Sequence, residues 1–179
     1  VIRAFLAVYY GDAQETIDYA RQALDYLPEQ DLTWRSAAAL PLGDAYMFKG
    51  DIAAAYDTRL EALEMSKKSG HPFMILISNG RLAWTLRQKG KLKQVIHLCE
   101  QQMQYADEYG ISQTLAAGWL ETQWAEALAI YESLLAQDPS LTDAKVRLIP
   151  ARVRTDLDRR LRRGDVENAE AGPVVRLVH

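Results

Sequence analysis

The chain has 179 residues, a length that suits one domain or a short repeat array. Its net charge of -3 gives no global attraction for nucleic acid or an anionic membrane, and its single cysteine, Cys99, excludes a disulfide framework and a cysteine zinc site. The sequence contains no run of 18 apolar residues, so it predicts no membrane-spanning helix. The 25 Ala and 23 Leu favour helix, and a start at Val1 within a helical pattern suggests a piece of a longer protein.

A turn signal recurs along the first half of the chain. Gly11-Asp12, Gly50-Asp51 and Gly90-Lys91 are separated by 39 and 40 residues, a spacing typical of stacked helix pairs. Seven residues before each glycine stands a small residue, as close helix packing requires, and apolar residues follow each glycine at matching offsets. We therefore predict an all-α fold built from antiparallel helix pairs.

The expected helices follow in chain order, with ends set by glycine, proline and aspartate signals. They span about residues 2–10, 12–27, 33–49, 51–68, 72–89 and 91–108. Pro41 lies inside the third helix, and we expect a kink there at a cost of roughly 3 kcal/mol unless the bend is used.

The run from Leu42 to Ala55, LGDAYMFKGDIAAA, resembles a tetratricopeptide (TPR) helix pair. Over residues 1–120 the chain is similar to the sensor region of large, MalT-like transcription regulators of the LuxR type. The resemblance implies a signal-binding superhelix that lies between an ATPase module and a DNA-binding module. The sequence shows neither a GxxxxGK[ST] phosphate loop nor a helix-turn-helix, so this chain is expected to sense or hold a ligand and not to regulate transcription alone.

The repeat is interrupted near residue 122. The next turn is due at residue 129 or 130, yet the run from Trp124 to Tyr131 reads as the second helix of a pair, about two turns early. We predict one long helix near residues 112–136, formed by a first-type helix joined to a second-type helix. An ancestral deletion, an atypical capping repeat or an engineered splice of two TPR proteins would each produce it.

We therefore divide the chain into three helix pairs (1–121), a fused helical segment that packs on the array (122–171) and a tail (172–179). Within the second segment, residues 145–163 carry eight positive and two negative side chains around an apolar stripe. The arginines surround the helix instead of forming one stripe, which favours a solvated face over a nucleic-acid site. We expect no nucleic-acid partner.

No catalytic or metal-binding pattern is evident, so we predict neither an enzyme nor a cofactor. His71, His97 and His179 are not spaced as metal ligands, and Cys99 falls at a buried position without a basic neighbour. The Asp and Glu pairs follow positions that are expected to face solvent, so the sequence does not support a hydrolase site built from two carboxylates.

The remaining candidate is a groove lined by the first helix of each pair. By resemblance, its residues are Asp44, Met47, Phe48, Trp84 and Arg87, which suit a peptide, protein or small-molecule ligand. The competing interpretation is that Phe48 and Trp84 pack between neighbouring pairs. We predict a cytoplasmic binding or sensing scaffold. Because the ends of a repeat array leave apolar faces uncovered, we also expect that a homodimer can form through the exposed terminal repeats. The alternative functional class is an engineered chimera of two TPR proteins without a native function.

Overall fold

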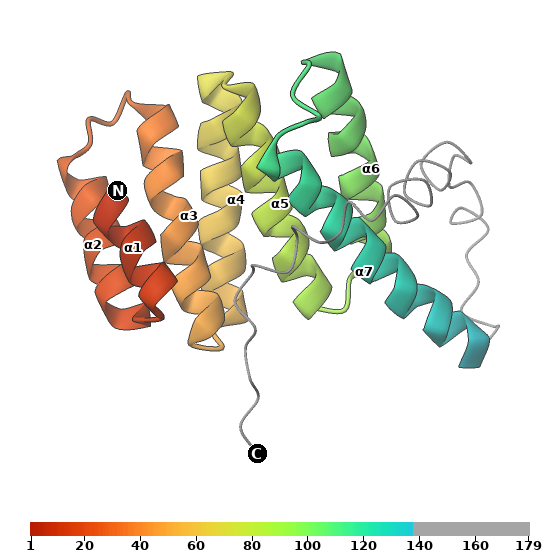
Figure 1. Cartoon of the computed structure of the whole chain (residues 1–179). Coiled ribbons are helices and arrows are strands. Elements are labelled where there is room, and N and C mark those ends of the chain that lie inside the picture. Colours follow the sequence, from red (N-terminus) through yellow and green to blue (C-terminus); the bar gives the residue numbers. More distant parts are fainter. Residues whose placement is uncertain (138–179) are drawn as a thin grey trace. The chain divides into compact units, whose positions relative to one another are not determined.

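The computed structural model describes residues 1–137, which contain helices and no strand. Residues Val1–Asp138 form one compact unit. Figure 1 shows the helix pairs in chain order, from α1 and α2 through α3 and α4 to α5 and α6, with α7 against α5 and α6. The helices are α1 (Ile2–Tyr10), α2 (Ala13–Tyr26), α3 (Leu32–Phe48), α4 (Ile52–Ser69), α5 (Pro72–Gln88), α6 (Leu92–Glu108) and α7 (Leu115–Gln137). The all-α repeat architecture is confirmed, whereas the expected basic helix at 145–163 and the tail at 172–179 lie outside the described residues.

The predicted turns join the two helices of each pair. Gly11, Gly50 and Gly90 have φ angles of +79°, +77° and +69°, which a residue without a Cβ adopts at low cost. Asp12 and Asp51 then cap the next helix, because their carboxylates accept hydrogen bonds from the backbone N–H groups of Glu15 and Ala54. The repeated Gly-Asp signal therefore ends one helix and begins the next.

Pro41 does not interrupt α3, which continues through it from Leu32 to Phe48. Every residue from Ser36 to Ala45 in this helix is buried. Packing on all sides of α3 thus offsets the local cost of a proline that lacks an N–H group.

The helices form two layers. Each first helix packs beside the next one, in the order α1, α3, α5 and α7, and also against the preceding second helix. Within residues 1–137 the second helices α2, α4 and α6 make no comparably extensive contact with one another. The first helices therefore contact one another along the array, whereas the second helices are splayed apart. We call the surface of α1, α3, α5 and α7 the inner face.

The long helix is confirmed as α7, which has 23 residues. It begins at Leu115, three residues later than expected, because the Thr114 hydroxyl accepts a hydrogen bond from the N–H of Ala117 and caps it. Its buried residues form one stripe that faces α5 and α6: Ala116, Ala117, Leu120, Gln123, Trp124, Ala127 and Tyr131. The proposed boundary at residue 121 falls within this continuous helix.

Two glycines provide a matched test of how closely α7 approaches α5. A Cβ on Gly80 of α5 would lie 2.8 Å from Cε3 of Trp119, whereas a Cβ on Gly118 of α7 would meet nothing within 4 Å. We expect Gly118→Ala to raise the free energy of unfolding by up to about 1 kcal/mol through helix propensity. Gly80→Ala should lower it by about 1 kcal/mol, because the overpacking cost exceeds the same gain.

Urea denaturation of the two variants measures both effects. If Gly80→Ala is as stabilising as Gly118→Ala, α5 and α7 do not approach each other as closely as the structure shows.

Candidate functional site

Aromatic side chains form a row across three first helices of the inner face. Phe48 of α3 meets Trp84 of α5 edge to face, with ring centroids 6.2 Å apart, and Trp84 meets Trp119 of α7 in the same way at 6.3 Å. Phe48 is 51% exposed, and the two tryptophans are half-buried. We call Phe48, Trp84 and Trp119 the aromatic row, which combines mutual packing with an open surface.

Asp44 is not an open groove residue, because it is fully buried at the centre of an ionic cluster. Its Oδ1 lies 2.7 Å from Nη2 of Arg59 in α4, and its Oδ2 pairs with Nη1 of Arg81 in α5. Arg59 also donates to the carbonyl oxygen of Arg81 and to the Thr85 hydroxyl. We call Asp44, Arg59 and Arg81 the ionic cluster; it joins α3, α4 and α5.

The cluster lies against the aromatic row. The Arg59 guanidinium stacks 4.7 Å from the Trp84 ring centroid, and that of Arg81 stacks 4.8 Å from Trp119. Burial lowers the pKa of Arg59 to about 10, although the nearby Asp44 carboxylate partly opposes this shift. Arg59 therefore remains protonated at neutral pH.

Close packing holds Arg59 in place. A Cβ on Gly43 would lie 3.0 Å from Cγ of Arg59, which explains the small residue at this repeat position. Ala4 and Ala83, at the matching positions, are fully buried as well.

Arg87 and Met47 are also on first helices. Nη1 of Arg87 lies 2.6 Å from Oε2 of Glu126, and its Nε donates to Oε1 of Gln123 at 3.2 Å, so Arg87 connects α5 to α7. Met47 is half-buried beside Phe48 in the sequence of α3. The five predicted residues thus lie on α3 and α5, and four of them retain exposed surface.

Sequence reasoning missed Trp119, Arg59 and Arg81. Trp119 follows Trp84 by 35 residues, and Trp84 follows Phe48 by 36, so a recurring spacing near the repeat length was available as a signal. Arg59 stands nine residues after its turn glycine, the slot that Ala20 and Cys99 fill in the other pairs. Ala20 and Cys99 are both fully buried. The same repeat position therefore predicts that the charge of Arg59 is buried and needs a partner.

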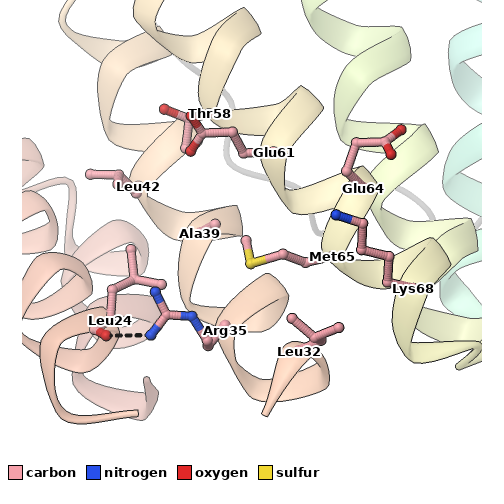
Figure 2. A pocket seen from close by; sticks show the side chains of 10 residues that line it. All are labelled: Leu24, Leu32, Arg35, Ala39, Leu42, Thr58, Glu61, Glu64, Met65 and Lys68. Carbon is pink, nitrogen blue, oxygen red and sulfur yellow. Dashed lines mark hydrogen bonds between the residues drawn. The ribbon is translucent and has the colours of Figure 1, made fainter. Parts of the chain in front are cut away.

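A pocket of about 330 Å³ opens on the other side of α3, between the splayed helices α2 and α4. Figure 2 shows Leu42 and Met65 lining it, and Arg35 bonded to the carbonyl oxygen of Leu24. Arg35 donates to the carbonyl of Leu27 as well, so its Nη1 caps the end of α2. Leu42 and Asp44 lie two residues apart on one helix, which places this pocket away from the ionic cluster.

Possible reactive or metal-binding groups in the described region include Cys99, which is buried. Burial raises the pKa of the Cys99 thiol to about 12, so this thiol is not a nucleophile at neutral pH. Residues 1–137 hold no group of three or more His, Cys, Asp and Glu side chains arranged around a metal position. None of the described helices has the length and apolar character that crossing a membrane requires.

Helix α1, at the N-terminal end of the array, has apolar side chains that are exposed to solvent. Ile2, Leu6, Tyr9 and Tyr10 are between 51% and 83% exposed. A homodimer through a terminal repeat stays a prediction.

Comparisons with known proteins agree with this architecture. The model of a family described as the MalT-like TPR region matches residues 1–132, ten residues beyond the interruption near residue 122. No curated protein matches the chain. Among solved structures, a putative kinesin light chain with nearly identical TPR-like repeats from Podosopora anserina is similar, at 17% identity and a TM-score of 0.56. A crystal structure of a single-substitution variant of that protein is 18% identical with the same TM-score, and both alignments cover 91% of this chain and 87% of the other.

Proposed function

The chain belongs to the MalT-like TPR region family, and we propose that its inner face binds an extended peptide segment of a partner protein. A helical-repeat scaffold of this type generally acts in interactions between proteins and not as an enzyme. The peptide ligand, the residues that hold it and the absence of catalysis in this chain are parts of the proposal.

The observation that carries the proposal is the partial exposure of the aromatic row. Phe48, Trp84 and Trp119 come from three different helix pairs, yet their rings form one continuous apolar surface that retains solvent contact. At the end of the row, half of Phe48 is open to solvent. Aromatic side chains with an exposed face are typical anchors for peptide side chains.

The outer pocket between α2 and α4 is a weaker candidate. Arg35 is already bonded to backbone carbonyls, and Glu61, Glu64 and Lys68 at the pocket are long, flexible side chains. No aromatic ring is present among the residues that line it.

A peptide library displayed on phage tests the proposal, because selection from a library requires no identified partner. Peptides enriched on the wild-type protein are measured by fluorescence anisotropy against Phe48→Ala and against Trp34→Ala. Trp34 is the matched control, because it also lies on α3 and is 55% exposed but is not part of the aromatic row. We expect Phe48→Ala to weaken binding at least tenfold, as loss of an aromatic anchor does, and Trp34→Ala to leave it unchanged.

Enrichment of no peptide, or of peptides that bind Phe48→Ala and the wild type equally well, would contradict peptide binding at the inner face. The engineered-chimera alternative stays a hypothesis. The family match extends to residue 132 and so does not end at the join expected near residue 122.

A further inference from the structure

The ionic cluster holds two positive charges and one negative charge. Asp44 is the ion-pair partner of both Arg59 and Arg81, and no second acid pairs with either within residues 1–137. Stacking on Trp84 and Trp119 stabilises the two guanidinium groups but does not change their formal charge. One positive charge is therefore left without a counterion in the described part of the chain.

Arg81, and not Arg59, is the arginine of the cluster that reaches the surface. The Arg59 side chain is fully enclosed, and its terminal nitrogens already donate to Asp44, Thr85 and the backbone of Arg81. The Arg81 side chain is 23% exposed, and the one acceptor that its guanidinium reaches within residues 1–137 is the carboxylate of Asp44.

The neighbouring Arg87 differs in this respect. It also projects from α5, but Glu126 lies 2.6 Å away and neutralises it. On α5, the positive charge that is not balanced by an acid of its own among the described residues is therefore that of Arg81.

One side of the Arg81 guanidinium is covered by the apolar ring of Trp119, and a low-dielectric neighbour of this kind strengthens an interaction with a negative group. Its guanidinium lies over Trp119, and Trp119 continues through Trp84 to the open ring of Phe48. A carboxylate on Arg81 and an apolar side chain on the aromatic row would be accommodated side by side.

We propose that Arg81 binds an acidic side chain of the peptide, next to an apolar side chain that lies on the aromatic row. This inference rests on the proposed peptide binding and adds the chemical class of the ligand. Asp44 and Arg59 act as positioning residues that hold the Arg81 guanidinium against Trp119.

A double-mutant cycle between protein and peptide tests the assignment. A peptide selected by the wild-type protein is compared with the same peptide in which each acidic residue is replaced by its amide. We expect the amide peptide to bind the wild type at least tenfold more weakly, as loss of a charge-assisted hydrogen bond predicts. Arg81→Gln should bind the two peptides with equal affinity.

The variants include controls for folding and for general charge. Arg81→Gln leaves the Asp44–Arg59 pair intact, and Arg81→Lys retains the charge and should keep the preference for the acidic peptide. Arg21→Gln removes an arginine of α2, which donates to the Tyr46 hydroxyl, and should also keep that preference. Circular dichroism and urea unfolding establish that each variant is folded.

The two proposals fail in different ways. Equal affinity of the wild type for the acidic and amide peptides, or a preference that survives in Arg81→Gln, overturns the role of Arg81 while Phe48-dependent binding stands. Selected peptides without acidic residues overturn it as well. Absence of any Phe48-dependent peptide contradicts the proposed function itself.

Discussion

Asp44→Ala is expected to lower the free energy of unfolding by about 3–5 kcal/mol, the cost of breaking a buried ion pair from one side. The carboxylate is fully buried and neutralises Arg59, whose side chain is also fully enclosed. Its removal leaves two guanidinium groups facing each other without an anion between them. Urea denaturation followed by circular dichroism measures the loss.

Asp57→Ala is the matched control, because Asp57 is an exposed acid on α4, and its replacement should change stability by less than about 0.5 kcal/mol. Adding Arg59→Met to Asp44→Ala should recover part of the loss, since one uncompensated charge is then removed. A loss below about 1 kcal/mol for Asp44→Ala would show that water reaches the cluster and that the charges are not buried.

Trp124→Ala is expected to cost about 3–5 kcal/mol, the usual range for a large aromatic side chain removed from a core. Trp124 is 2% exposed on α7, and its indole N–H donates to Oε1 of Glu100 on α6 at 3.4 Å. Because Trp124 follows the interruption near residue 122, its contribution measures whether that part of α7 belongs to the array.

Ile130 on the same helix provides the control. It is 43% exposed, and we expect Ile130→Ala to cost less than about 1 kcal/mol. Comparable small losses for both variants would mean that the second half of α7 separates from α6 in solution.

The repeat could be predicted from the sequence because its determinants are local. A glycine with positive φ and an aspartate cap act on backbone groups only a few residues away. Gly50 therefore ends α3 and Asp51 begins α4 without help from distant parts of the chain. The length of α7 could also be predicted, although its first residue depended on the Thr114 cap.

The ionic cluster could not be predicted from helix periodicity alone. Asp44 occupies the same repeat position as Trp84, six residues before its glycine, so both were placed on the inner face. Asp44 is buried instead because Arg59 and Arg81 reach it from neighbouring helices. Those pairs join residues 15 and 37 positions apart, and no pattern along one helix encodes them.

The central claim is that the aromatic row is a binding surface and not part of the core. The most direct measurement is the free energy of unfolding of Phe48→Ala beside its affinity for a peptide selected by the wild type. Because Phe48 is 51% exposed, we predict a stability loss of about 1 kcal/mol or less together with at least tenfold weaker binding. A loss of about 3 kcal/mol or more with unchanged affinity would contradict the account and make Phe48 a packing residue.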